Sequence, residues 1–282
     1  MTDKPVTYIS IGEGDRQRRI ATLQHTPDAS AHPRPAPYDS TPAPGLVWLP
    51  GFKSEMTSTK ATALQAYADA NGLVLTRFDY SGHGQSDGAF EDGTISAWLE
   101  ETLAVLAQRT TGPQILVGSS MGGWLALLAL RHALATGSTT GQVANIRALV
   151  LIAPAWDMTQ TLMWDAFPAA VKAQVEREGR FERPSAYDDG PYVITRTLIE
   201  DGAKHLIADA PFDPGCPVLI LHGLIDPDVP WEHSMELESL LEGDRVRIAM
   251  VPDGEHRLSR DEDLAQLFSL IEDATRESAD NA

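Results

Sequence analysis

The chain has 282 residues, of which 43% are hydrophobic and 22% charged, and its net charge is -18. This apolar content is enough for one large domain, and the negative charge would repel nucleic acid and so excludes such a partner. The single cysteine, Cys216, excludes an internal disulfide and a Cys-x-x-Cys metal pair. A lone cysteine beside a predicted strand is typical of a small buried hydrophobic residue, and it favours a reducing compartment.

The first residues, MTDKPVTYISIGEGD, lack the basic region and apolar stretch of a secretory signal. Nowhere does an apolar run reach the roughly 18 to 20 residues of a membrane span. We therefore expect a cytoplasmic protein without a membrane span.

Residues 5–24 predict two strands, 8–11 and 20–24, followed by a loop rich in Pro, Ala and Asp that reaches Pro44. From residue 45 onward, short apolar runs alternate with amphipathic ones. Strands so apolar are covered on both faces, which predicts a doubly wound, mostly parallel α/β sheet. The expected strands are 46–49, 73–78, 115–117, 148–152, 217–221 and 246–251, and the expected helices are 59–70, 95–108, 121–134, 231–241 and 264–274.

Residues 155–211 interrupt this alternation and are much longer than a strand connection requires. Their helical stretches, 166–178 and 192–208, are separated by prolines. An insertion of this size in such a sheet indicates a lid. We expect one domain over 1–282, with a helical lid inserted at 155–211.

The pattern G-x-S-x-G, which exposes a serine nucleophile on a tight strand-to-helix turn, occurs twice. Around Ser120 an apolar strand precedes the pattern and a helix follows at once. Around Ser86 the strand is too distant, no helix follows, and Asp87 would oppose developing negative charge. Ser120 is therefore the predicted nucleophile.

The stretch 82–87 also resembles a dinucleotide-binding turn, but Asp87 stands where the third glycine is needed and no helix begins there. We therefore expect no cofactor. His83 in this stretch is interpreted as a loop residue.

A triad in this fold runs in the order serine, acid, histidine. His233 lies within a predicted helix, whereas His256 follows the last strand and is the predicted base. Asp226 follows a buried strand and is the predicted acid that orients the base. Asp228 is interpreted as a turn or N-cap residue.

The expected oxyanion donors are the backbone N–H groups of Met121 and Phe52, by their positions after the nucleophile and after the first buried strand. Several motifs together now support a family assignment. They are LPGF at 49–52, RFDYSG at 77–82, SDG at 86–88, GPQILVGSSMGGW at 112–124 and HG through PW at 222–231.

These motifs resemble the α/β-hydrolase family of the mitochondrial palmitoyl-protein thioesterases, which also includes mycophenolic acid acyl-glucuronide esterase activity. The resemblance extends from about residue 46 to the end and includes 184–187. It implies the same triad roles for Ser120, Asp226 and His256, and the same oxyanion donors. Pro50-Gly51 replaces the His-Gly of many α/β-hydrolases, in agreement with this family. We expect no mitochondrial transit peptide in the first residues, so location and physiological substrate are not carried over.

An apolar cluster opens the predicted lid. Its members either pack the lid onto the sheet or form an adaptable wall for an acyl or aromatic group. The predicted substrate-binding residues in it are Trp156, Met163, Trp164 and Phe167.

The sequence predicts a serine hydrolase of carboxylic esters or thioesters, without a metal, acting on a small molecule or an acylated protein. Carbon–carbon bond hydrolysis and peptide hydrolysis would use the same triad and remain alternatives. Dehalogenase and epoxide-hydrolase chemistry would need an aspartate in place of Ser120. A non-catalytic binding protein would have no need of all three triad residues.

Overall fold

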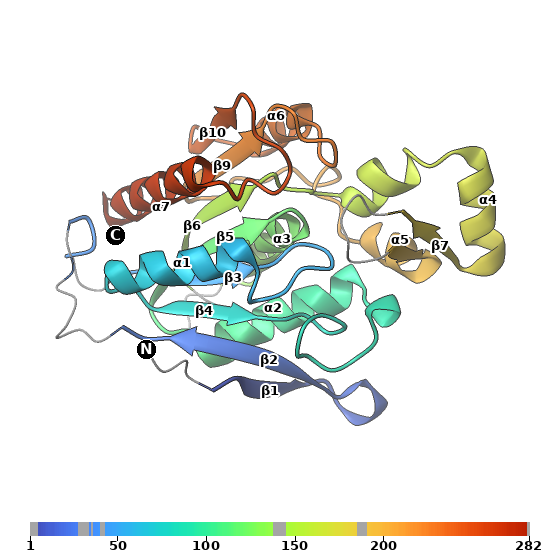
Figure 1. Ribbon diagram of the computed structural model, residues 1–282, viewed down its shortest axis with the longest axis horizontal. Coiled ribbons are helices and arrows are strands. Elements are labelled where there is room, and N and C mark those ends of the chain that lie inside the picture. Colours follow the sequence, from blue (N-terminus) through green and yellow to red (C-terminus); the bar gives the residue numbers. More distant parts are fainter. Residues whose placement is uncertain are drawn as a thin grey trace.

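The structure, a computed structural model, describes residues 5–27, 34, 36–39, 43–137, 145–184 and 191–280. Within this part, an eight-stranded sheet has the order β1-β2-β4-β3-β5-β6-β9-β10 (Figure 1). Its strands are β1 Thr7–Ile11, β2 Arg18–His25, β3 Gly45–Leu49, β4 Leu75–Phe78, β5 Pro113–Ser119, β6 Asn145–Ile152, β9 Val218–Gly223 and β10 Val246–Val251. The α-helices are α1 Thr59–Ala70, α2 Ile95–Arg109, α3 Met121–Ala135, α4 Ala169–Glu178, α5 Arg196–Gly202, α6 Trp231–Leu240 and α7 Asp261–Asp280.

The six strands from β3 to β10 in this sheet pair in parallel, which is the predicted arrangement. The two N-terminal strands are antiparallel and belong to the same sheet, because β2 pairs with β4. The sequence predicted these two strands as an extension without placing them. Ile9 and Ile20 pair across the hairpin and are buried, whereas Tyr8 is exposed.

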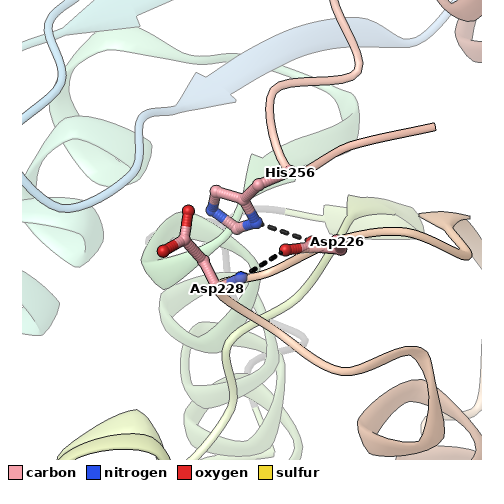
Figure 2. Close-up of side chains that lie close together, drawn as sticks. All are labelled: Asp226, Asp228 and His256. Carbon is pink, nitrogen blue, oxygen red and sulfur yellow. Dashed lines mark hydrogen bonds and ion pairs between the residues drawn. The ribbon is translucent and has the colours of Figure 1, made fainter. Parts of the chain in front are cut away.

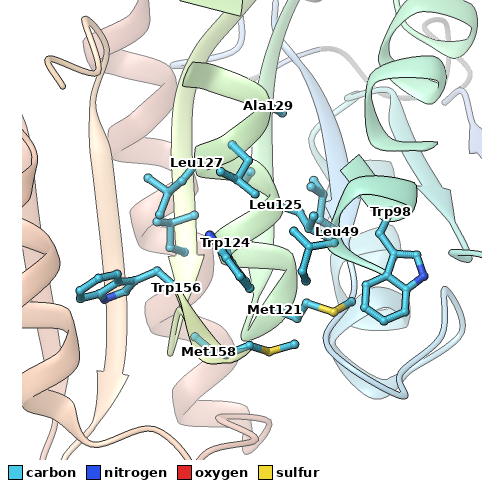
Figure 3. Packing of buried hydrophobic residues seen from close by; sticks show 14 of the residues in the cluster. Leu49, Trp98, Met121, Trp124, Leu125, Leu127, Ala129, Trp156 and Met158 are labelled. Atoms are coloured by element: carbon cyan, nitrogen blue, oxygen red, sulfur yellow. The ribbon is translucent and has the colours of Figure 1, made fainter. Parts of the chain in front are cut away.

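Side chains that alternate along each strand enter two separate cores. Val47 and Leu49 of β3 join one core with α2, α3 and α6, and Leu46 and Trp48 join the other with α1 and α7. Figure 3 shows the first core, in which Trp124, Leu125 and Leu127 of α3 share one hydrophobic cluster with Leu49 and Trp98. The sheet is thus covered on both faces, as the uniformly apolar strands require.

The 155–211 insertion lies beyond the carboxyl ends of the parallel strands (Figure 1). It contains the π-helical turn η3 Thr159–Trp164, α4, a small antiparallel sheet and α5. The strands of that small sheet are β7 Arg180–Arg183 and β8 Tyr192–Thr195. The predicted helix over 192–208 is therefore wrong at its start, where the β-branched run Tyr-Val-Ile-Thr forms β8. Residues 185–187 of the 184–187 motif lie outside the described part of the chain.

Cys216 is buried, and burial raises the pKa of its thiol to about 12, so it behaves as a small apolar residue, as predicted. Over the described ranges, no helix is both long enough and apolar enough to cross a bilayer.

Candidate active site

Ser120 stands between β5 and α3, on the strand–turn–helix predicted for the nucleophile. Its backbone has φ 53° and ψ -117°, a conformation that L-residues rarely adopt and that marks a strained turn. The Ser120 N–H donates to the Ile152 carbonyl at 2.9 Å, and its carbonyl accepts from Ala155 N–H at 3.1 Å. These bonds to β6 and the segment after it hold the strained turn in place.

The flanking glycines are required by close backbone approach. A Cβ atom added to Gly122 would lie 2.0 Å from the Leu49 carbonyl oxygen, and one added to Gly118 would lie 2.4 Å from the Gly122 carbonyl oxygen. The turn therefore closes only with glycine at both positions, which gives the G-x-S-x-G pattern its physical meaning.

His256 and Asp226 meet Ser120 in the predicted order. The His256 Nε2 atom is 3.2 Å from Ser120 Oγ, and its Nδ1 atom is 2.7 Å from Asp226 Oδ2. Figure 2 shows His256 and Asp226 approaching from two loops that follow β10 and β9. The structure thus brings all three predicted triad residues together, although they are separated by up to 136 positions in the chain.

Asp226 is held as a carboxylate. Its Oδ1 accepts the backbone N–H groups of Asp228 at 2.8 Å and Val229 at 2.9 Å. Burial by itself raises the pKa of Asp226, but the nearby His222 ring and hydrogen bonds from His256 and Val229 outweigh burial and bring the pKa well below its ordinary value. Asp226 therefore stays charged over the working pH range.

Sequence reasoning missed His222, which is fully buried behind this acid. Its Nε2 lies 2.9 Å from the Val229 carbonyl and 3.6 Å from Asp226 Oδ2, and its Nδ1 lies 2.6 Å from Ser234 Oγ. The His-Gly that ends β9 was the available signal, but a histidine in a strand gives no indication of its partner.

Asp228 lies in the turn after β9, which is one of the two roles that the sequence allowed, and it is not the N-cap of the following helix. The N-cap of α6 is Pro230, whose side chain makes no capping bond. The Asp228 carboxylate instead lies beside the His256 ring (Figure 2) and lines the cavity. The Asp228 N–H donates to Asp226 Oδ1 within the turn, and the Asp228 side chain points toward the cavity.

The two expected oxyanion donors flank the serine. Met121 is the first residue of α3, where backbone N–H groups have no acceptor within the helix. A Cβ atom added to Gly51 would lie 3.4 Å from Ser120 Cβ, so the loop after β3 passes directly beside Ser120. Phe52 follows Gly51 in this loop, and its ring packs against Phe90 at 4.8 Å between centroids.

The competing candidates have structural partners elsewhere. Ser86 Oγ donates to the Asp79 carbonyl at 2.6 Å and accepts from Ala21 N–H at 2.8 Å. His233 is buried, and its Nε2 lies 2.7 Å from the Trp156 carbonyl. Burial lowers the pKa of His233 to about 4, so it is neutral at neutral pH.

A cavity of about 780 Å³ opens onto Ser120 and His256. This volume falls within the usual range for small-molecule sites. Its apolar side comes from the insertion, and its charged side includes Lys60, whose amine donates to the Arg257 carbonyl beside His256. Burial lowers the pKa of Lys60 to about 8. The apolar residues contributed by the insertion are Ala155, Met158, Leu162, Met163 and Ile194.

Of the four predicted substrate-binding residues, only Met163 lines this cavity. The Trp156 ring stacks on His233 at 4.3 Å, and Phe167 packs edge-on against Phe181 at 5.6 Å. Trp164 lies under the Lys172 amine at 5.6 Å. These three aromatic residues pack the insertion, which is the alternative that the sequence left open. Composition identified the cluster, but the π-helical turn decides which side of it faces the cavity.

In the described ranges, one group of side chains has the spacing of a metal site: Asp226, Asp228 and His256, whose ligand atoms lie within 4.8 Å of one another. Asp226 already accepts three hydrogen bonds from His256 and the loop amides. We therefore assign the group to the triad and its surroundings.

This fold, with a serine on the elbow and a histidine and carboxylate behind it, defines the α/β hydrolases. The alpha/beta hydrolase family matches residues 43–270, and the chain belongs to that family and is a hydrolase. Both the predicted fold and the predicted family are confirmed.

Two mammalian relatives and one bacterial structure are similar to the chain. The human mitochondrial palmitoyl-protein thioesterase ABHD10 is 34% identical over 232 residues, which cover 82% of this chain and 72% of that protein. The structure of alpha/beta hydrolase domain-containing protein 10 from mouse has a TM-score of 0.78 and 29% identity, covering 96% of this chain and 98% of the other. A structure from Agrobacterium vitis S4 has a TM-score of 0.86 and 40% identity, covering 96% of this chain and 100% of the other.

Proposed function

We propose that the chain hydrolyses carboxylic esters or thioesters through an acyl-enzyme formed on Ser120. The main support is the continuous contact from Ser120 Oγ to His256 Nε2 at 3.2 Å and from His256 Nδ1 to Asp226 Oδ2 at 2.7 Å. A serine, a base and an orienting acid in this geometry can generate a nucleophile at neutral pH.

In the first half of the reaction, Ser120 Oγ attacks the substrate carbonyl carbon and passes its proton to His256 Nε2. The carbonyl oxygen becomes an oxyanion, to which the Met121 and Phe52 N–H groups donate. The carbon–oxygen or carbon–sulfur bond then breaks, and His256 returns the proton to the leaving group. Water repeats the sequence on the acyl-enzyme and releases the acid.

The apolar side of the cavity favours an acyl group of some length. Met158, Leu162 and Met163 are flexible or branched apolar residues, and methionine in particular adapts to chains of different shape. The similar human relative is named a palmitoyl-protein thioesterase, which agrees with a long acyl chain. We accordingly propose that residues 155–211 act as a lid that binds the acyl group.

The proposed substrate is a small molecule or an acylated protein, because either can present an acyl chain to this cavity. The cytoplasmic location expected from the sequence also remains a proposal, since the similar mammalian relatives are mitochondrial by name. The composition, with its single buried cysteine, is compatible with any reducing compartment.

A leaving-group panel tests the proposed function. Wild-type protein and Ser120→Ala are compared on p-nitrophenyl esters, acyl thioesters, p-nitroanilides and a β-diketone. Turnover of the esters or thioesters that vanishes in Ser120→Ala supports the proposal. Turnover confined to the anilide or the diketone would favour peptide or carbon–carbon bond hydrolysis instead.

A further inference from the structure

His83 lies in the loop after β4, where it lines the cavity and contacts the loop that carries Phe52. Although the sequence indicated only a loop residue, His83 is 5% exposed. Its ring packs edge-on against the rings of Phe90 and Trp98, at 5.2 and 5.4 Å between centroids. Neither Ser120 nor the other triad residues touch it through a described hydrogen bond, so the proposed reaction does not use it directly.

Both ring nitrogens of His83 are bonded to the backbone, and the bonds define the tautomer. The Lys53 N–H lies 3.0 Å from His83 Nε2, and the Ser81 carbonyl lies 3.1 Å from His83 Nδ1. Because a backbone N–H can only donate, Nε2 is the acceptor, and Nδ1 carries the proton donated to Ser81. Burial lowers the pKa of His83 to about 4, so this neutral form persists at neutral pH.

Lys53 directly follows the expected oxyanion donor. Its φ is 58°, a left-handed conformation that a non-glycine residue keeps only when its surroundings hold it. The Ser54 N–H donates to the Gly51 carbonyl at 3.0 Å, which closes the turn over Phe52 and Lys53. The bond to His83 therefore fixes the peptide group after Phe52, and the turn fixes the peptide group before it.

We propose that His83 is a positioning residue of the oxyanion hole. By accepting the Lys53 N–H, it holds the turn so that the Phe52 N–H stays directed at the carbonyl oxygen bound to Ser120. The inference rests on the proposed function, because it takes the Phe52 amide as an oxyanion donor.

A neighbouring contact allows a positioning role of His83 to be distinguished from a role in packing alone. Asp79 accepts the N–H groups of Met56 at 2.6 Å and Gln85 at 2.9 Å, and so joins the two loops independently of His83. Replacement of His83 therefore leaves the loops connected while it releases the Lys53 amide. A residue that only filled the core would change stability and leave transition-state stabilisation untouched.

The matched variants are His83→Phe, which keeps an aromatic ring without an acceptor, and His83→Gln, whose amide oxygen can accept from Lys53. Complete loss of one oxyanion donor lowers kcat by about 10²–10³-fold, and a displaced donor should cost about 10- to 100-fold. We expect that loss in His83→Phe with little change in KM, and a large recovery in His83→Gln. The affinity for a trifluoromethyl ketone, which forms an oxyanion on the serine, should fall by the same factor as kcat.

The inference would be overturned if His83→Phe kept the kcat and the ketone affinity of the wild type. It would also be overturned if His83→Phe and His83→Gln lost the same activity and showed the same drop in Tm. If His83→Phe does not fold, His83→Gln is compared with His83→Asn, whose shorter amide cannot reach Lys53. The Gln variant must then be the faster enzyme, and equal rates would contradict the proposal. Wild-type protein that hydrolyses neither esters nor thioesters overturns the proposed function and this inference together. A wild type that is active and matched by His83→Phe overturns only the inference.

Discussion

Two serines carry the same local motif, and their surroundings separate them. Ser86 bonds its own loop at 2.6 Å and β2 at 2.8 Å, while Ser120 faces His256. We predict that Ser120→Ala abolishes ester turnover. Ser86→Ala should keep a large part of wild-type activity and lose about 1 kcal/mol of stability, since it removes two partly buried hydrogen bonds. Steady-state assays and denaturant unfolding of both variants check this, and an inactive, folded Ser86→Ala protein would refute the assignment.

The two acids near His256 should differ sharply in their effect on catalysis. Asp226 accepts the Nδ1 proton of His256 at 2.7 Å, so Asp226→Asn should lower kcat by about 10⁴-fold, as the same change does in a serine protease. Asp228→Asn should lower kcat by less than about tenfold, because a partly exposed charge contributes about 1 kcal/mol or less. Pre-steady-state and steady-state rates of the two variants provide the measurement. Similar losses would mean that the two carboxylates share the role.

At the level of elements, the insertion should set the preference for acyl length. Each methylene buried against an apolar wall contributes about 0.8 kcal/mol, or three- to fourfold in kcat/KM if fully expressed. We predict that kcat/KM rises from acetyl to hexanoyl esters, and that Met163→Ala flattens this rise. Trp164→Ala is the matched control, since Trp164 packs beside Lys172 and does not line the cavity.

The chain-length series is measured on activated esters with a common leaving group. A preference of the wild-type protein for acetyl esters would refute a binding role for the insertion. A flattened rise in Trp164→Ala with a normal rise in Met163→Ala would show that the wrong side of η3 has been assigned to the substrate.

The comparison of sequence and structure shows which elements local patterns determine. The helix over 59–70 and the strand over 246–251 were predicted with the bounds of α1 and β10, because apolar runs between turn residues have few alternatives. The insertion was harder, because β8 owes its conformation to pairing with β7 rather than to its own periodicity.

The candidate site also has residues that the sequence could predict and residues that it could not. The triad residues could be predicted because each follows a strand end, where this fold gathers its chemistry. The cavity wall could not, because whether Met163 or Trp164 faces the cavity depends on the path of a π-helical turn. Backbone partners such as the Lys53 amide of His83 leave no mark in the sequence at all.

For the whole molecule, two buried histidines make stability depend on pH. Burial lowers the pKa of His83 and of His233 from 6.5 to about 4. Between these values the unfolded chain binds protons that the folded chain does not, so stability falls as pH decreases from about 6.5 to about 4. The loss approaches about 3 kcal/mol for each histidine at the lower limit.

Urea unfolding at pH 7 and at pH 5 measures this effect. The His83→Gln and His233→Gln variants should each show a smaller difference between the two pH values than the wild type. His132→Gln, at an exposed position, should leave the difference unchanged. A pH dependence that is the same in all four proteins would contradict the account.

The central claim is that Ser120 is the nucleophile of this hydrolase, and covalent labelling tests it most directly. The protein is treated with a fluorophosphonate, the intact mass is recorded over time, and the modified peptide is sequenced by tandem mass spectrometry. We predict a single adduct on Ser120, a loss of turnover in proportion to its formation, and no adduct in Ser120→Ala. An adduct on another residue that accompanies inactivation, or full turnover after complete modification of Ser120, would contradict the account.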